Sequence, residues 1–307
     1  MDRAPEGKRC PACRGPSSPM RMLLAGSYRL HRCRSCRTQF LVALDDSTGD
    51  SEYWSDPYKF ELYADRAVRR DFDQRYRRVF DHVEESFGPV RSVVDVGCGV
   101  GNFLEFAGRQ GWTSTGYDVD SDAVKTAQAR GLMAALDPED LDRLVEDGSV
   151  DAGTLWDVVE HLADPAPVLL RLASKIRPGG ALVIETPDAD FPVRPVVRWL
   201  RSISGGRIKL AGRMYYWEHK IYFTVEGLRR LLRRVGCEVV WITHENSPRV
   251  KMSRLWERSA TEGRLASKVM VRAWPWLDLA TRLLGMGNKI ILVARVPQTT
   301  VGAGSTG

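Results

Sequence analysis

The chain has 307 residues, with 45 Lys and Arg against 39 Asp and Glu, which gives a formal net charge of +6. An apolar fraction of 43% and a charged fraction of 27% are ordinary for globular proteins and exclude disordered, collagen-like and coiled-coil chains. Residues 1–11 lack the apolar region of a secretory signal, and no stretch has the roughly 18 uncharged apolar residues that span a bilayer, so we expect a soluble, cytoplasmic protein.

Residues 1–45 form a small module, here called the ribbon, built on two Cys-x-x-Cys pairs. The pairs are Cys10 with Cys13 and Cys33 with Cys36. This spacing is typical of four thiolates that bind one Zn²⁺ ion tetrahedrally. Because four protein ligands leave no open coordination position, we expect a structural zinc that replaces the core that so short a segment lacks.

An alternation of strands and helices follows a linker and an N-terminal helix at residues 46–89. Residues 45–56 are acidic and show no periodic pattern of apolar residues. In residues 58–87 the apolar residues recur at the spacing expected for one face of a helix. We then expect strands at 92–96, 113–118, 151–156, 181–186, 238–243 and 289–296, with helices at 102–110, 121–130, 165–176 and 224–235. The alternation predicts an α/β domain with a doubly wound sheet at residues 90–296, followed by a flexible tail at 297–307.

A glycine-rich loop follows the first strand of this domain. Residues 95–101 (DVGCGVG) run from the strand directly into a helix, where glycines permit positive φ and let a ligand approach the backbone. The spacing G-x-G-x-G differs from the dinucleotide fingerprint G-x-G-x-x-G. The next strand ends at Asp118, which can accept hydrogen bonds from a ribose diol. Asp95 would repel a pyrophosphate, so the pattern argues against a dinucleotide.

This loop and Asp118 resemble the first two motifs of class I S-adenosylmethionine-dependent methyltransferases, and residues 155–162 (LWDVVEHL) and 177–180 (RPGG) match later motifs in order. The resemblance implies a Rossmann-like seven-stranded sheet whose last strand is antiparallel, and S-adenosylmethionine as the cofactor. It places Asp95, Gly97, Gly99 and Gly101 at the methionine part, Asp118 at the ribose, Val119 on the adenine, Asp140 and Leu141 at the adenine edge, and Trp156 near the sulfonium.

Asp157, Glu160 and His161 follow a strand at the edge of the sheet where ligands bind. On a helical turn they would share one face, and His161 could act as a base that Asp157 or Glu160 orients. Alternatively, Glu160 and His161 cap a helix and pack under the loop. His219 is the second candidate base, or a loop histidine paired to an acid.

The same cluster is similar to that of ubiquinone-pathway O-methyltransferases, in which two acids and the histidine bind a divalent ion. The resemblance implies a Mg²⁺ ion at the acceptor site, with Asp157 standing where the relatives usually have Glu.

An insert at residues 191–216 follows the fifth strand, where we expect it to cover the acceptor pocket as a lid. Between residues 192 and 213 it carries six basic residues and no acid, which equals the net charge of the chain: Arg194, Arg198, Arg201, Arg207, Lys209 and Arg213. Such a lid suits an acidic or lipid-linked acceptor, or contact with an anionic membrane surface. The alternative is a solvated helix whose apolar side is core.

The sequence favours a small-molecule methyltransferase that O-methylates a carbohydrate, lipid-linked or other secondary-metabolite hydroxyl. A sugar C-methyltransferase is the nearest enzymatic alternative, since similar ribbons precede such enzymes. An RNA-binding methyltransferase is less favoured, because the basic residues beside the cysteines also balance the charge of four thiolates. A catalytically silent cofactor-binding module is the alternative from another class.

Overall fold

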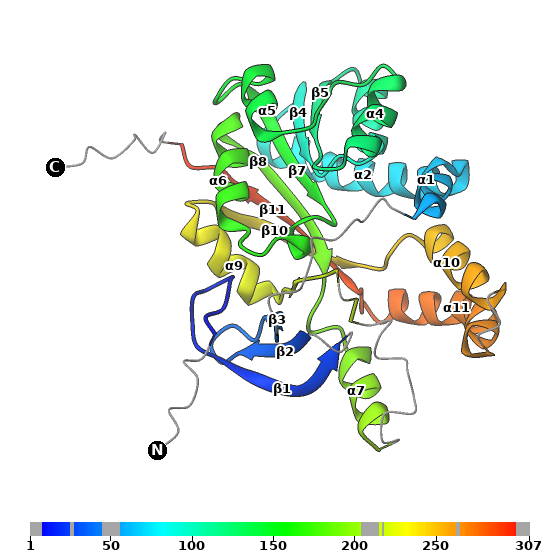
Figure 1. The fold of residues 1–307 in the computed structure, drawn as a ribbon. Coiled ribbons are helices and arrows are strands. Elements are labelled where there is room, and N and C mark those ends of the chain that lie inside the picture. The colour runs from blue at the N-terminus through cyan, green and yellow to red at the C-terminus, as the bar shows by residue number, and fades with distance from the viewer. Residues whose placement is uncertain are drawn as a thin grey trace.

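The computed structural model describes residues 8–24, 28–44, 56–203, 215–216, 218–261 and 265–298. These residues form one large and one small β-sheet with surrounding helices (Figure 1). Of the predicted linker at 45–56 only Asp56 is described, and of the predicted tail only Pro297 and Gln298. None of the helices in the described ranges is long and apolar enough to cross a membrane.

The large sheet has seven strands in the order β10-β11-β8-β7-β4-β5-β6. The strands are β4 (Ser92–Val96), β5 (Thr113–Tyr117), β6 (Ala134–Ala135), β7 (Val150–Trp156), β8 (Ile176–Pro187), β10 (Glu238–Glu245) and β11 (Lys289–Arg295). Only β11 runs antiparallel to its neighbours β8 and β10, while β4 to β8 are parallel. The predicted sheet with an antiparallel last strand is therefore confirmed.

Helices cover both faces of this sheet. On one face α2 (Arg66–Phe87) and α3 (Asn102–Arg109) pack on alternate strand residues such as Val93 and Val183. On the other face α5 (Pro138–Leu144), α6 (Ala166–Lys175) and α9 (Val225–Arg234) pack on Val94 and Ile184. A further helix, α4 (Ser121–Ala129), packs with α3 beside β6. Strands covered on both faces contain runs of apolar residues, which is why the sequence pattern located them well.

The helix expected at residues 58–87 consists of α1 (Pro57–Ala64) and α2, separated at Asp65. The backbone of Asp65 is extended, with ψ 123°, and its carboxylate accepts hydrogen bonds from the amides of Ala67 at 2.7 Å and Val68 at 3.3 Å. Asp65 therefore acts as the N-cap of α2, and the helical apolar spacing continues across the break.

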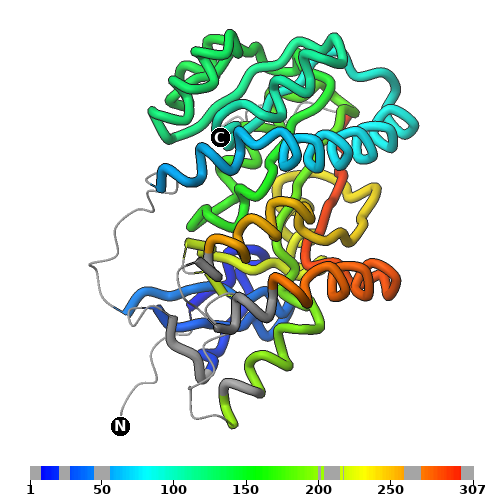
Figure 2. The backbone as a smooth tube through the Cα atoms, turned by 90° about the vertical axis from the view of Figure 1, so that its right-hand side faces the viewer, coloured from blue at the N-terminus to red at the C-terminus, as the bar shows by residue number. Residues whose placement is uncertain are grey.

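Two helices that the sequence did not predict, α10 (Arg249–Thr261) and α11 (Leu265–Leu283), lie between β10 and β11. Their apolar residues have only a weak helical pattern, and Pro275 stands inside α11. The helix α10 packs against α2, and the hydroxyl of Tyr58 in α1 donates to the carbonyl of Arg254 at 3.1 Å. The helices α10 and α11 therefore form an additional layer next to α1 and α2 (Figure 2).

The ribbon forms the small antiparallel sheet, with β1 (Ser17–Leu24), β2 (Tyr28–Cys33) and β3 (Gln39–Ala43). Its fourth strand is β9 (Ile221–Tyr222), which belongs to the large domain, and the paired residues are Gln39 with Tyr222 and Phe40 with Ile221. Both views place the ribbon strands (blue) below the large sheet. The ribbon is thus a separate module in sequence but shares a sheet with the large domain.

A buried ion pair fastens α2 to the sheet. The guanidinium of Arg75, 3% exposed, donates to Glu185 at 2.6 Å and lies 3.3 Å from Glu245. Arg75→Met should lower the free energy of unfolding, measured in urea, by about 3–5 kcal/mol, because it leaves buried carboxylates without a partner. The double variant Arg75→Met, Glu185→Leu should recover part of that loss. Equal losses in the single and double variants would contradict this.

Candidate active site

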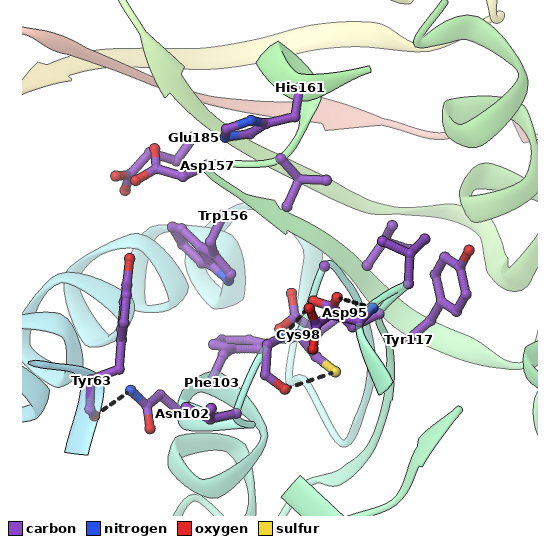
Figure 3. A pocket seen from close by; sticks show the side chains of 18 of the residues that line it. Tyr63, Asp95, Cys98, Asn102, Phe103, Tyr117, Trp156, Asp157, His161 and Glu185 are labelled. Atoms are coloured by element: carbon purple, nitrogen blue, oxygen red, sulfur yellow. Dashed lines mark hydrogen bonds between the residues drawn. The ribbon is translucent and has the colours of Figure 1, made fainter. Parts of the chain in front are cut away.

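A cavity of about 670 Å³ opens at the carboxyl ends of β4, β5, β7 and β8, a volume within the range of small-molecule pockets. Figure 3 shows Asp95, Cys98 and Tyr117 at one end of this cavity and Asp157, His161 and Glu185 at the other. We call these the loop end and the histidine end. The loops that follow the parallel strands line most of the cavity, and α1 and α2 close one side.

The loop end is shaped by glycines that no other residue could replace without strain. Gly97 and Gly101 have φ of +77° and +82°. A Cβ atom on Gly97 would lie 2.2 Å from a methyl group of Val158, and one on Gly101 would lie 2.4 Å from a methyl group of Leu132. The amide of Gly97 donates to the carbonyl of Tyr117 at 2.7 Å, which ties the loop to β5.

Two buried carboxylates flank this loop. Asp118 accepts hydrogen bonds from the amides of Gly99 at 2.8 Å and Asp120 at 3.0 Å, and burial raises its pKa. Asp95, 2% exposed, accepts from the hydroxyl of Thr154 at 2.6 Å, and burial raises its pKa to about 8. Both side chains line the cavity and present oxygens to a ligand there.

The structure brings most of the predicted cofactor residues to the cavity but not all. Those that line it are Asp95, Gly97, Gly99, Asp118, Val119 and Trp156. Gly101 lies behind the loop as the N-cap residue of α3. Leu141 is 1% exposed in the hydrophobic core, and Asp140 pairs with Arg143 on the surface of α5. Both residues belong to the short helix α5, and neither is among the residues that line the cavity.

Asp157 does not share a helical face with Glu160 and His161, contrary to the expectation from their spacing. It has a left-handed φ of +58°, and the short 3-10 helix η2 (Val159–His161) begins only after it. Its carboxylate forms an ion pair with Lys289 of β11 and lies 4.0 Å from Lys251 of α10. Burial opposes ionisation, but the two lysines hold the pKa of Asp157 below its ordinary value.

Glu160, His161 and His219 form a compact cluster, whose potential ligand atoms all lie within 4.8 Å of one another. Glu160 is fully buried, and one carboxylate oxygen accepts from the hydroxyl of Thr186 at 2.9 Å, while the other has no hydrogen-bond partner among the described residues. The Nδ1 atom of His161 lies 3.1 Å from the carbonyl of Glu218. The two imidazole rings meet edge to face with centroids 4.7 Å apart.

Burial sets the protonation of this cluster. It raises the pKa of Glu160 to about 8 and lowers that of His161 to about 4, and it also lowers the pKa of His219. At neutral pH both imidazoles are therefore uncharged, so His161, which lines the cavity, can accept a proton there. The two histidines and the carboxylate could also hold a divalent ion.

The sequence did not predict the aromatic residues from α1 and α2 or the acid from β8 that line the cavity. Tyr63, Phe72 and Tyr76 from α1 and α2 line the cavity, as does Glu185 of β8. The aromatic residues have the spacing of an ordinary core-facing helix, which does not distinguish a core from a cavity wall. The signal for Glu185 was stronger, because a single acid inside the apolar run of residues 181–186 (ALVIET) must be compensated.

The four ribbon cysteines gather at one point, and three of them are buried. The sulfur atoms of Cys10 and Cys36 lie 3.7 Å apart, and those of Cys13 and Cys33 lie 3.4 Å apart. Four sulfurs about 2.3 Å from a tetrahedral zinc would be separated by about 3.8 Å, so this arrangement fits such an ion. Arg14 and Arg37, which follow the two Cys-x-x-Cys pairs, both have left-handed φ, as in a symmetric pair of metal-binding turns.

The predicted basic lid is only partly a charged surface. The described part of it is Phe191 and Pro192, the helix α7 (Val193–Ile203), and Tyr215 and Tyr216. Arg194 is 5% exposed and lies over the rings of Tyr215 and Tyr222, with its guanidinium carbon 4.9 and 4.6 Å from their centroids. Arg198 donates to the hydroxyl of Tyr215. These two arginines attach the helix to Tyr215 and Tyr222.

The apolar side of α7 is instead exposed at one turn after another, at Val196 (53%), Trp199 (61%) and Ile203 (62%). The alternative of a helix whose apolar side is core therefore holds for Val197, which packs in a hydrophobic cluster with Tyr215 and Tyr222, but not for these three residues. Arg207, Lys209, Arg213 and the side chain of Arg201 lie outside the described residues.

Residues 65–241 match the protein family described as a methyltransferase domain. The match covers more than half of the chain, so the chain belongs to this methyltransferase family. The resemblance to class I S-adenosylmethionine-dependent methyltransferases, inferred from the motifs, is thereby confirmed for family and fold.

Two named relatives are similar over shorter stretches. The ubiquinone biosynthesis O-methyltransferase of Xanthomonas campestris is 30% identical over 152 residues, which cover 46% of this chain and 64% of that protein. The enzyme of the same name from Xanthomonas oryzae is 35% identical over 140 residues, covering 42% and 59%. The chain thus spans less than two thirds of the length of these curated relatives.

Among solved structures, a putative sarcosine dimethylglycine methyltransferase from Galdieria sulphuraria superposes with a TM-score of 0.51 at 14% identity. The superposition covers 80% of this chain and 98% of that chain. At this identity the likeness shows the fold alone.

Glu160 should make stability depend on pH. Because its pKa is raised to about 8 in the folded protein, the folded state keeps a proton that the unfolded chain loses, and stability falls as the pH rises from about 5 to 8. Glu160→Gln removes the loss of stability that ionising this buried carboxylate causes at high pH. Its gain in Tm should be at least about 4 °C larger at pH 8 than at pH 5, since 1 kcal/mol corresponds to roughly 2–4 °C here.

The matched control is Glu226→Gln, which changes an exposed acid paired with Arg230 on α9 and should show no such difference. A Glu160→Gln protein that loses stability at pH 8 would contradict the prediction and indicate that a partner, such as a metal ion, holds the carboxylate ionised.

Proposed function

We propose that this protein transfers the methyl group of S-adenosylmethionine to a hydroxyl of a small-molecule acceptor. The observation that carries the proposal is a single cavity with the glycine loop and Asp118 at one end and the uncharged His161 at the other. Its volume of about 670 Å³ is suited to small-molecule ligands. Membership of the methyltransferase family supports the same cofactor.

At the loop end we assign the cofactor to the predicted residues that line the cavity. Asp118 would accept hydrogen bonds from the ribose diol, and Asp95 with the loop of Gly97, Gly99 and Gly101 would hold the methionine part. Val119 is 79% exposed and offers its apolar surface to the adenine ring. The ring of Trp156 would lie near the sulfonium, whose positive charge an aromatic face favours.

At the histidine end the protein needs to supply orientation and a proton acceptor, because the sulfonium is already reactive. We assign the base to His161, with His219 and Glu160 packed beside it. Asp157 is paired with Lys289, so its role would be to balance the charge of that lysine rather than to orient His161.

Binding of a divalent ion is an alternative role for the histidine end of the cavity. Glu160, His161 and His219 form the set that fits an ion, in place of the Asp157-containing set that the family resemblance implied. Two imidazoles and one carboxylate suit zinc, manganese or iron better than the Mg²⁺ that was expected.

For the ribbon we propose a structural Zn²⁺ held by Cys10, Cys13, Cys33 and Cys36. The sulfur separations and the burial of three of the thiols support it. We assign this zinc a structural rather than a catalytic role, because all four ligands are protein side chains.

For the acceptor we propose an apolar or lipid-linked molecule over a free sugar nucleotide. The aromatic wall of Tyr63, Phe72 and Tyr76 supports an apolar acceptor, and the exposed Trp199 on α7 supports contact with a lipid or an anionic membrane surface. The relatives named for ubiquinone biosynthesis support O-methylation. Sugar C-methylation stays the alternative, and release of S-adenosylhomocysteine with phenolic or lipid pools but not with nucleotide-sugar pools would exclude it.

Calorimetry with S-adenosylmethionine tests the cofactor. Asp118→Asn should weaken binding by about tenfold to a hundredfold, because charge-assisted hydrogen bonds are worth roughly 1.5–3 kcal/mol. Asp122→Asn, which changes an exposed acid in α4 nearby, should bind like the wild type. A wild-type protein that binds no S-adenosylmethionine would exclude the proposed function.

The pH dependence of turnover tests the base, using an acceptor found in the pool screen. With its pKa near 4, His161 stays uncharged at pH 5, so the rate should change little between pH 7 and pH 5. An ordinary histidine with a pKa near 6.5 would lose activity by about 25-fold over that range. His161→Gln should lower kcat by about 10²–10⁴. Retention of full kcat would show that His161 is not the base.

A further inference from the structure

We propose that the metal-bound ribbon is part of the acceptor side of the active site, because it holds the segment that carries His219 and Lys220. The inference rests on the proposed zinc site and deepens the proposed function. It predicts that losing the ribbon metal disrupts the histidine end of the cavity and leaves the loop end intact.

The shortest connection runs through the shared sheet. The strand β3 begins three residues after Cys36 and pairs with β9. The amide of Leu41 in β3 also donates to the carbonyl of Lys220 at 2.8 Å, and Lys220 lines the cavity. His219 precedes Lys220 directly, so a single strand separates a metal ligand from the cluster at the histidine end.

A second connection fastens the other side of β9. The hydroxyl of Thr224 donates to the carbonyl of Cys36 at 2.6 Å and accepts from the amide of Gly227 at 3.0 Å, which caps α9. A Cβ atom on Gly227 would lie 2.0 Å from the hydroxyl of Thr38, so ribbon and helix are in close contact here. The segment between Lys220 and Thr224 is therefore attached to the ribbon at both of its ends.

A third set of contacts joins the ribbon to residues on either side of α7, and the first cysteine pair to α9. Gln39 is 3% exposed, donates to the carbonyl of Ala189 at 3.4 Å and accepts from the hydroxyl of Tyr215 at 3.0 Å. Arg234 of α9 donates to the carbonyls of Pro11 and Ala12 at 3.0 and 2.8 Å. Both cysteine pairs are thus fixed to the large domain.

The loop end is supported differently. The amides of Gly97 and Cys98 donate to Tyr117 of β5, and Gly99 donates to Asp118, so this loop is tied to the central parallel strands. These strands form the middle of the large sheet, with helices on both faces. The loop end should therefore keep its shape when the ribbon loosens.

The metal decides whether the ribbon is rigid. A segment of about 40 residues buries too little apolar surface to fold firmly alone, and a structural zinc supplies the missing folding free energy. Without the ion β3 would loosen, and β9, a strand of two residues, would lose its pairing with β3. The bridge between Phe223 and Asp188 anchors the end of β9 that is farther from His219. His219 and Lys220 would then lose their places beside His161.

The test compares the full-length protein before and after its zinc is removed with a chelator and replaced. Zinc content, amide hydrogen exchange of residues 219–222 and calorimetric affinity for S-adenosylhomocysteine are measured on each sample. We expect one zinc per chain, exchange at 219–222 that becomes roughly tenfold faster or more on removal, affinity unchanged within twofold, and full recovery with zinc.

Two results would overturn the inference: unchanged exchange at 219–222 without zinc, or loss of exchange protection and of S-adenosylhomocysteine binding together. The second would mean that the metal supports the whole fold. A wild-type protein that binds no S-adenosylhomocysteine would instead refute the proposed function, and the exchange measurement would still test the link between ribbon and β9.

A variant that keeps all four cysteines tests the connection directly. Thr224→Val removes the hydroxyl that joins Cys36 to α9, and should speed exchange at 219–222 while zinc content and cofactor affinity stay unchanged. Thr224→Ser keeps the hydroxyl and should behave like the wild type. Arg37→Ala, which breaks an exposed ion pair between the ribbon and Asp190, is the control expected to change nothing. Equal exchange in all three variants would contradict the inference.

Discussion

The parallel arrangement of β4, β5, β7 and β8 is the constraint on which the site depends. Helices cover both faces of these strands, so their side chains are mostly apolar, and polar groups gather where the strands end. Since parallel strands end at the same edge, Asp95, Asp118, Asp157 and Glu185 converge there from four different strands. The cavity and its chemistry follow from this geometry.

Burial then gives the two ends of the cavity different electrostatics. At the loop end, two backbone amides donate to the carboxylate of Asp118 and favour its charged form, whereas burial raises the pKa of Asp95 to about 8. At the histidine end, burial leaves His161 uncharged and suppresses the charge of Glu160, while Lys289 compensates Asp157. The proton acceptor His161 therefore lies close to carboxylates that contribute little net negative charge. Such surroundings suit an acceptor molecule with an uncharged hydroxyl that must lose its proton.

The ribbon shows how a module that is separate along the chain can be inseparable in packing. Its apolar residues, among them Phe40 and Ala12, join the same hydrophobic core as Leu228 and Leu231 of α9. Pairing between β3 and β9 extends this contact into a shared sheet whose last strand leads to His219. The sequence boundary near residue 45 therefore does not divide the acceptor side of the site.

Local patterns in the sequence determined most of the strands and helices of the large sheet, the glycine loop with Asp118, and the four cysteines, because each depends on neighbouring residues or short spacings. Tertiary structure alone decided which side chains meet. The pairing of Asp157 with Lys289, the burial of Arg194 over two tyrosine rings, and the turning of Leu141 into the core all join residues distant in sequence or depend on packing. The basic insert looked like a charged lid because composition counts charges, whereas only packing determines which of them face water.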